Sequence, residues 1–281
     1  MSESNESLKA IIGSVGQLKV LPQVVFQIMS TTSDDQSSGA MLERQISVDP
    51  GFTARLLSMA NSSYYALPKR VTSIRDAVLL LGFKVIRELA MNASVFDMFV
   101  GKTDKESMRR RDWWKHSVDT GVLARWLAEQ NGKIDPAEAY TAGLLHFIGK
   151  TTMDQFDPAA YERILGVVEK GAPERLAERT LYGVDHIDVG VALAENWKFP
   201  ETISQALNYE DSPNERFPDT PLRAAVAVAT QFARYVADPE CDAEERLCQM
   251  NWALDALMIT ADQLPTMLFR ASEVTSSRRA A

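Results

Sequence analysis

The sequence predicts an all-α fold, and three observations lead to this prediction. Apolar residues recur at helical spacing in several segments. Aspartate–proline pairs, which place an N-cap acceptor before a proline at the first helical position, recur along the chain. A sustained alternation of apolar and polar residues, which is typical of half-buried strands, is absent. We therefore expect helices from one end to the other.

Capping signals locate the expected helix starts. Asp-Pro pairs occupy residues 49–50, 135–136 and 157–158, where the aspartate can accept a backbone N–H and the proline has none to leave unpaired. Two further signals resemble capping boxes, with Ser73 three residues before Asp76 and Asp185 three residues before Asp188. We expect a helix to begin at each of these points.

Apolar stripes define the body of the expected helices. The segment from Met108 to Gln130 carries Trp, Val and Leu side chains along one face, and the segment from Leu222 to Val236 is typical of a buried helix rich in Ala and Val. Residues 52–60 form a shorter stripe, and residues 78–89 form another that is interrupted at Gly82. The pattern predicts helices rather than strands throughout.

The charge balance disfavours nucleic acid as the main ligand. The 281-residue chain has 30 Lys and Arg against 38 Asp and Glu, a formal net charge of −8, so its long-range field repels polyanions. The one basic run, at residues 109–111, lies among other charged residues, and we expect it to be solvated surface. An apolar fraction of 46% indicates an ordinary globular chain with a packed core.

The cysteines and the short apolar runs favour a cytoplasmic protein without a membrane segment. Cys241 and Cys248 match neither a zinc site nor a redox pair, so free thiols are expected. Residues 1–8 are polar and acidic, unlike a secretory signal. The longest apolar runs, near residues 77–83 and 224–229, are too short to cross a bilayer.

The three histidines, His116, His146 and His186, are the first candidates for a chemical site. Imidazole is the commonest protein ligand of transition metals, so separate helices could bring the three together around an ion. The alternative, which composition alone favours, is that each histidine has an ordinary hydrogen-bond partner in the core or at its boundary. Both interpretations stay open at this point.

Nearby carboxylates fit both interpretations as well. Asp112 and Asp119 share one helical side with His116 and could bind a metal or orient its ligand. Asp112 could equally offset the dipole of a helix start, while Asp119 could face water, and we favour these simpler roles. The aspartates around His186 are explained by capping. No serine-hydrolase elbow, phosphate-binding loop or His-Glu-x-x-His motif occurs, so no cofactor is expected.

Short motifs in a fixed order resemble those of the HDOD family. In the N-terminal half they are Leu21-Pro22, Ile46-Ser47-Val48-Asp49-Pro50, Ala54-Arg55-Leu56-Leu57, Ala60-Asn61-Ser62-Ser63-Tyr64-Tyr65, Ser73-Ile74-Arg75-Asp76-Ala77 and Leu81-Gly82. In the middle they are Trp114-Lys115-His116-Ser117, Ala142-Gly143-Leu144-Leu145-His146-Phe147-Ile148-Gly149-Lys150, Gly183-Val184-Asp185-His186, Trp197 and Pro200. They cover most of residues 17–236, and the resemblance implies a multi-helix, HD-like fold.

The resemblance also implies that a metal site has been lost. In the related HD phosphohydrolases a His, a His-Asp pair and a later Asp bind a divalent metal that activates water. The matching positions here are His116, His146, Phe147 and Thr230. A phenyl ring donates no lone pair, and a single hydroxyl is a weak ligand. An additional His pair of many relatives is replaced by Asn208-Tyr209. Together with His186, the matching positions would form a vestigial pocket with no metal and no catalytic residue.

The same resemblance sets the expected domain organisation. We expect a tail or helix over residues 1–16, an HDOD-like domain over residues 17–236 and a C-terminal helical extension over residues 237–281. Within the domain, an N-terminal lobe would end near residue 100 and an HD-like lobe would begin near residue 101. No internal repeat or low-complexity linker divides the chain.

Three functions are compatible with the sequence. The favoured one is a non-catalytic, bacterial-type regulator of signal transduction that binds a protein partner or a small ligand. The alternative is a residual metal-dependent phosphohydrolase acting on nucleotides or cyclic dinucleotides through His116, His146 and His186. A third is a scaffold or homo-oligomer in which Tyr64 and Tyr65 form the contact, since Tyr is enriched at interface hot spots. The same tyrosines could instead pack between the lobes.

Overall fold

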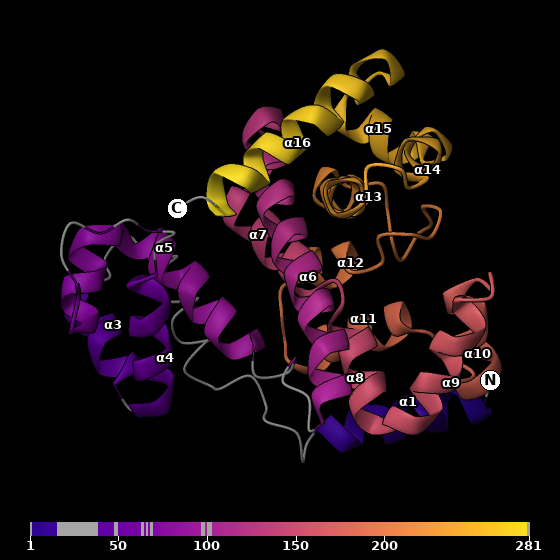
Figure 1. The fold of residues 1–281 in the computed structure, drawn as a ribbon, viewed down its shortest axis with the longest axis horizontal. Coiled ribbons are helices and arrows are strands. Elements are labelled where there is room, and N and C mark those ends of the chain that lie inside the picture. Colours follow the sequence, from indigo (N-terminus) through magenta and orange to yellow (C-terminus); the bar gives the residue numbers. More distant parts are fainter. Residues whose placement is uncertain are drawn as a thin grey trace. The chain divides into compact units, whose positions relative to one another are not determined.

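The computed structural model describes residues 2–15, 39–47, 50–62, 65, 67, 70–96, 99 and 103–279, and this part of the chain is helical with no strand (Figure 1). The helices are α1 (Ser2–Val15), α3 (Gly39–Ile46), α4 (Pro50–Ala60), α5 (Ile74–Phe96), α6 (Asp104–Asn131), α7 (Pro136–Leu145), α8 (Ile148–Phe156), α9 (Pro158–Val168), α10 (Glu174–Tyr182), α11 (His186–Asn196), α12 (Glu201–Ala206), α13 (Pro221–Ala237), α14 (Ala243–Gln249), α15 (Asn251–Leu257), η3 (Ala261–Gln263) and α16 (Leu264–Arg279). The predicted all-α class is confirmed.

The predicted helix starts are confirmed. Helices α4, α7 and α9 begin at the prolines of the three Asp-Pro pairs. The side chain of Asp135 accepts the backbone N–H of Ala137 at 2.8 Å, and that of Asp157 accepts the N–H of Ala160 at 2.9 Å. The third aspartate, Asp49, lies outside the described residues. These short polar caps satisfy helix N–H groups that have no partner within the helix.

The two other capping signals also begin helices. The hydroxyl of Ser73 accepts the N–H of Asp76 at 3.0 Å where α5 begins. At the start of α11, Asp185 and Asp188 form a reciprocal capping box. Helix α5 is broken where the sequence predicts it, because Gly82 has a positive φ of 81° inside the segment.

The predicted long helix around residues 108–130 begins one turn earlier than expected. Thr103 caps α6 by accepting the N–H of Glu106, and Gly132 ends it in the left-handed conformation with φ 71°. The expectation that the basic run is solvated is wrong for two of its three residues. Arg109 and Arg110 both donate to Asp154 of α8, whose side chain is buried, while Arg111 is exposed. Asp154 lies 44 residues after Arg110 in the sequence, so the local pattern does not indicate this pairing.

The chain divides into two compact units, which are described separately. The large unit comprises residues 1–18 and 98–275, and the small unit comprises residues 19–97 and 276–281. In the small unit, α3 and α4 pack on α5. Its buried core includes Leu42, Phe52, Leu56, Ile86 and Leu89. The domain boundaries expected from the sequence stay predictions.

Asn61, which belongs to the motif at residues 60–65, makes three hydrogen bonds to the backbone of the small unit. Its side-chain oxygen accepts the N–H of Val71 at 2.7 Å, and its side-chain nitrogen donates to the carbonyls of Leu57 and Val71, both at 2.8 Å. One side chain thereby ties the end of α4 to the segment before α5. Because a backbone N–H and carbonyl of the same residue are both satisfied, the asparagine amide has a structural role here.

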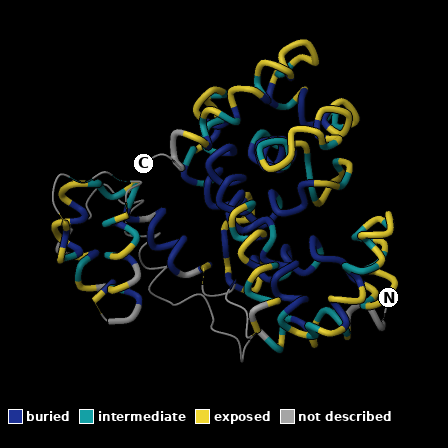
Figure 2. Tube along the Cα trace, viewed as in Figure 1, coloured by how far each residue is buried: buried dark blue, intermediate teal, exposed yellow. Residues whose placement is uncertain are grey.

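The large unit is built around α6 and α13. Helix α6 packs against α7 and α13, α13 also packs against α15, and α8 packs against α11, with α1 lying on α8 and α11. Residues 222–233 of α13 are all buried. Figure 2 shows buried segments, drawn in dark blue, among the helices of the large unit. A Cβ atom added to Gly143 of α7 would lie 2.8 Å from the Cα of Gly121 in α6. The two helix backbones therefore touch without a side chain between them.

The described helices include none with the combination of length and apolar character that a membrane crossing requires. Both cysteines are free thiols, with Cys248 exposed and Cys241 half-buried. The expected absence of a membrane-spanning helix therefore holds for the described part of the chain.

Candidate functional site

The large unit brings four of the five predicted pocket residues together. His116 lies in the middle of α6, His146 is the C-cap of α7, Phe147 is the N-cap of α8, and His186 is the first residue of α11. The fifth, Thr230, lies on α13 and is buried, but its hydroxyl donates to the carbonyl of Val226 in its own helix at 2.8 Å. That hydroxyl proton is therefore committed to the helix backbone.

Phe147 fills the centre of the cluster. Its ring centroid lies 4.1 Å from that of His146 and 4.7 Å from that of His116, with the His116 ring stacked against it. The two imidazole centroids are themselves 5.1 Å apart, and His186 meets the edge of Phe147 at 6.2 Å. The aromatic ring packs directly against both histidines that a metal would need.

His146 is buried and His116 is half-buried, and both imidazoles are electrically neutral. The Nδ1 of His146 donates to the carbonyl of Gly143 at 2.6 Å, which leaves its Nε2 as an acceptor. The Nε2 atoms of both histidines are shielded from solvent, and neither has a hydrogen-bond partner in the described part of the chain. Burial, followed by the charges of Lys150 and Arg234, lowers the pKa of His116 to about 3. Burial and neighbouring His116 likewise hold the pKa of His146 far below its usual range.

These depressed pKa values predict acid sensitivity. The unfolded chain takes up protons on both histidines near pH 6.5, whereas the folded chain does not, so their contribution to stability is present above pH 6.5 and is lost as the pH falls toward 3. We expect the free energy of unfolding, measured by denaturant titration between pH 7 and pH 4, to fall less steeply in His116→Phe than in the parent. Equal slopes would contradict this interpretation.

His186 differs from the other two because it has a buried anionic partner. Its Nδ1 donates to Glu178 Oε2 at 2.7 Å, and its backbone N–H donates to the same oxygen at 3.0 Å. The other oxygen of Glu178 accepts the hydroxyl of Tyr161 at 2.6 Å, and Tyr209 lies 3.3 Å from His186 Nε2. Burial opposes the charged imidazole, but Glu178 and then Glu174 outweigh it and raise the pKa of His186 to about 9.

Lys150 extends this polar network toward the histidine cluster. Its ammonium group pairs with Glu174 at 2.7 Å and lies 4.8 Å from the centroid of the Phe147 ring. A cation over an aromatic face is stabilised by the ring quadrupole. Phe147 is therefore held by the two imidazoles and by the lysine.

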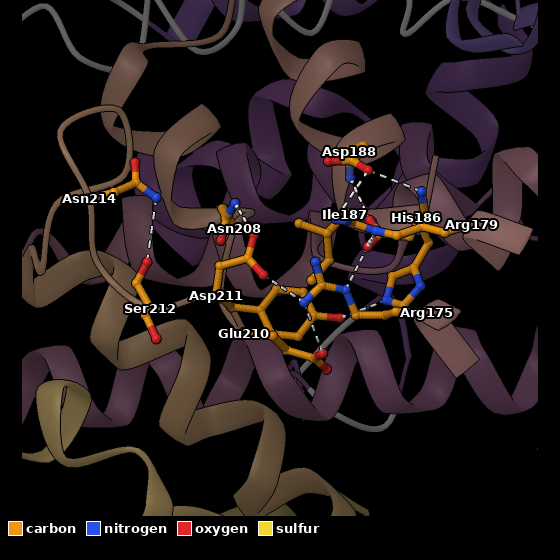
Figure 3. Close-up of polar contacts among 12 residues, drawn as sticks. Arg175, Arg179, His186, Ile187, Asp188, Asn208, Glu210, Asp211, Ser212 and Asn214 are labelled. Atoms are coloured by element: carbon orange, nitrogen blue, oxygen red, sulfur yellow. Dashed lines mark hydrogen bonds and ion pairs between the residues drawn. The ribbon is translucent and has the colours of Figure 1, made fainter. Parts of the chain in front are cut away.

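A second polar layer fixes the start of α11, as Figure 3 shows. Asp185 is fully buried and accepts the backbone N–H groups of Ile187 and Asp188, both at 3.0 Å. Arg175 and Arg179 also donate to Asp185, at 2.7 and 2.8 Å. Arg175 continues to Asp211 at 2.8 Å, which joins α10 to the segment after α12. These bonds orient the helix end that carries His186.

Several sequence predictions about individual residues need correction. Asp119 is buried rather than facing water. Asp112 is exposed, but α6 begins at Asp104, so Asp112 does not lie at a helix start. Tyr64 lies outside the described residues, and Tyr65 is half-buried. The predicted interaction role of these tyrosines stays a prediction.

Sequence reasoning missed Glu178, Lys150 and Tyr161. The sequence of α10 contains two Glu and two Arg among its other residues. It gives no sign that Glu178 alone is buried while Leu176 and Leu181 are exposed. Glu178 is buried, although the leucines of the same helix are exposed, because it contacts Tyr161 and His186 of other helices. A charged residue is fully buried only when it is paired and hydrogen-bonded, as Glu178 is.

The donor set does not fit a hydrolytic metal ion. The two donors without a hydrogen-bond partner are the Nε2 atoms of His116 and His146, and no carboxylate stands at either place where the related enzymes have one. Among the described residues, no group of three His, Cys, Asp or Glu side chains could hold a metal. Two neutral imidazoles leave the charge of a divalent ion uncompensated.

The motifs and the fold together have counterparts in known proteins. A family model described as "HDOD domain" matches residues 18–213, which is most of the chain. This chain belongs to the HDOD family. The fold class and the family expected from the motifs are both confirmed.

Solved structures resemble this HDOD protein over nearly its whole length. An HDOD domain protein with unknown function from Geobacter sulfurreducens is 23% identical, with a TM-score of 0.75 over 98% of this chain and 97% of that one. A protein from Shewanella amazonensis SB2B, named as a candidate phosphohydrolase, is 27% identical, with a TM-score of 0.70 over 96% of this chain and 98% of that one. A candidate signal transduction protein from Marinobacter aquaeolei VT8 is 21% identical, with a TM-score of 0.72 over 99% of this chain and 65% of that one.

A curated relative is longer than the HDOD protein described here. It is an uncharacterized protein of Treponema pallidum (strain Nichols), 23% identical over 238 residues. The match covers 84% of this chain and 46% of the relative, so the chain spans about half the length of the curated relative that it matches.

Proposed function

We propose that this HDOD protein is a non-catalytic regulator of signal transduction that acts by binding a protein partner or a small ligand. The observation that carries the proposal is the packing of Phe147 against His116 and His146, at centroid distances of 4.7 and 4.1 Å. A hydrolytic site of this kind needs a carboxylate at that position and a second one at Thr230. Neither residue supplies an anionic oxygen.

The state of the histidines supports the same proposal. His116 and His146 are neutral, and the only strongly protonated imidazole, His186, is already paired with Glu178. A protonated, hydrogen-bonded histidine offers no lone pair to a metal. Because Phe147 occupies the space between the imidazoles, we favour contact with a protein partner over ligand binding at this cluster. A cytoplasmic location, suggested by the free thiols, is part of the proposal.

A residual phosphohydrolase is the second candidate, favoured by one specific observation. The structure of the Shewanella amazonensis protein named as a candidate phosphohydrolase matches this chain over 98% of its length. Under this candidate, His116, His146 and His186 would bind a metal with a substitute carboxylate such as Asp119 or Asp185. The His146→Ala variant would then lose both bound metal and activity.

Metal content and phosphodiesterase activity distinguish the two candidates. We expect protein purified without chelators to contain substoichiometric transition metal by mass spectrometry, and to show no turnover of bis(p-nitrophenyl) phosphate or cyclic dinucleotides with added Mn²⁺ or Mg²⁺. The Phe147→Asp/Thr230→Asp double variant restores both carboxylates and is expected to bind Mn²⁺ more tightly than the parent. Stoichiometric metal and turnover in the parent, both absent from His146→Ala, would refute the non-catalytic proposal.

Self-association is a separate part of the proposal and has its own measurement. Light scattering or sedimentation across a range of protein concentrations gives the mass in solution. A constant monomer mass would remove the homo-oligomer, with Tyr64 and Tyr65 at its contact, from the possible modes of action.

A further inference from the structure

A cleft separate from the histidine cluster is lined by residues of α6, of the segment from residue 257 to residue 263, and of α16. Helices α6, α15 and α16 are labelled in Figure 1. The volume of the cleft is about 610 Å³, within the range of small-molecule sites. The residues that line it come from the last two turns of α6, the segment after α15, and the first turns of α16. None of them belongs to the cluster of His116, His146, Phe147 and His186.

The inner part of the cleft is apolar and has one large aromatic side chain. Leu127 and Leu257 are buried at its floor, and Trp126, Ile259 and Met267 are half-buried along its walls. The centroid of the Trp126 ring lies 6.2 Å from that of Phe232 in α13, which is buried and does not line the cleft. An indole beside aliphatic and thioether groups suits a flat, polarisable ligand.

The rim of the cleft carries amide groups that have unused hydrogen-bonding capacity. Gln130, Asn131 and Gln263 all line it. The Nδ2 atom of Asn131 has no hydrogen-bond partner in the described structure but is shielded from solvent, and its Oδ1 accepts the N–H of Lys133 at 3.3 Å, so this side chain offers the cleft no free group. The Oε1 atom of Gln263 accepts the N–H of Thr260 at 3.0 Å, which leaves its NH₂ group for another acceptor. The two amides exposed at the rim, Gln130 and Gln263, can donate to the acceptor atoms on the edge of a nucleobase.

Two charged side chains of opposite sign complete the rim. Arg270 of α16 and Asp262 of η3 are exposed, and neither has an ion-pair partner within the described residues. A guanidinium group matches the oxygens of a phosphate, and a carboxylate accepts hydrogen bonds from sugar hydroxyls. Met258, also at the rim, has a positive φ of 58°, an unfavourable conformation for a methionine that the surrounding chain maintains.

We propose that this cleft binds a mononucleotide, with its base against Trp126, the base edge on the amides of Gln130 and Gln263, and its phosphate on Arg270. Stacking on an aromatic side chain is tolerant of base identity, so the amides would set any preference among bases. The net charge of −8 disfavours long polyanions but not a ligand with one or two phosphate charges that meets a local cation. This goes beyond the proposed function, because it concerns a different part of the large unit.

Binding of AMP and GMP, compared with adenosine and guanosine, tests the proposal. We expect saturable binding of at least one nucleotide to the full chain by isothermal titration calorimetry. Arg270→Ala should weaken nucleotide binding about tenfold or more while leaving nucleoside binding nearly unchanged, because only the phosphate contact is lost. Arg111→Ala, which removes an exposed arginine outside the cleft, is the matched control and should bind like the parent.

A second variant tests the stacking contact. Trp126→Leu should weaken nucleotides and nucleosides alike, and its thermal unfolding shows whether it is folded. Because Arg270 is exposed, Arg270→Ala decides the outcome even if Trp126→Leu does not fold. Absence of saturable binding by both nucleotides, or nucleotide affinity unchanged in Arg270→Ala, would overturn the proposal. The metal and phosphodiesterase measurements are independent of this result, so either proposal can fail alone.

Discussion

The Gly149→Ala variant is expected to lose the native packing of the large unit. A Cβ atom at residue 149 would lie 1.9 Å from the carbonyl oxygen of His186 and 2.6 Å from the backbone nitrogen of Gly190. Both are backbone atoms, so no side-chain rotation relieves the overlap, and α8 and α11 would have to separate. Overpacking that side chains can absorb costs about 1–3 kcal/mol, and this change should exceed that range. Thermal unfolding followed by circular dichroism measures the loss.

Gly166→Ala is the matched control for that prediction. Gly166 lies inside α9, and a Cβ atom there would meet nothing within 4 Å. Alanine is favoured over glycine in a helix by about 1 kcal/mol, so this variant should be as stable as the parent or more so. The same substitution would thus act in opposite directions at the two positions. A Gly149→Ala protein that melts within a few degrees of the parent would contradict the close approach of α8 and α11.

The Glu178→Gln variant is expected to destabilise the protein by about 3–5 kcal/mol near pH 6.5, because it leaves a buried imidazolium without its anionic partner. Glu178 is fully buried and accepts two hydrogen bonds from His186 and one from Tyr161. Denaturant unfolding measures the difference. Glu162→Gln is the control, because Glu162 is exposed and pairs with the exposed Lys105, so that the loss of its charge should produce no measurable change.

The pH dependence of the free energy of unfolding gives a second test of the ion pair between Glu178 and His186. The pKa of His186 is raised to about 9 in the folded chain, against about 6.5 when unfolded. The stability from this shift, about 3 kcal/mol, is therefore fully present below pH 6.5 and is lost as the pH rises through 9. We expect the parent to lose stability between pH 6.5 and 9 and Glu178→Gln to show a flatter profile. Parallel profiles would mean that His186 is not held protonated by Glu178.

Much of the fold could be predicted because its signals are local. An Asp-Pro pair begins a helix through contacts within four residues, and Gly82 breaks α5 through its own φ. The family could also be predicted, because its motifs are short and ordered. The capping box at Asp185 and Asp188 belongs to the same class, since both partners lie in one helical turn.

The polar interior could not be predicted, because its partners are distant in sequence. Arg110 is buried beside Asp154 of another helix, which accepts a hydrogen bond from its Nε, and Glu178 is buried beside Tyr161 and His186, which both donate to it. Each residue alone is typical of a solvent-facing position. The candidate site was therefore found from its histidines, while the groups that fix the charge of His186 were not.

The bare contact between Gly121 and Gly143 determines how the histidine cluster responds to change elsewhere. His116 lies five residues before one glycine and His146 three residues after the other, on helices whose main chains touch. Their separation is thus set by peptide geometry, which varies far less than the size of an intervening side chain would. Repacking the surrounding core should leave the two imidazoles in register, whereas a single methyl group at either glycine would push them apart.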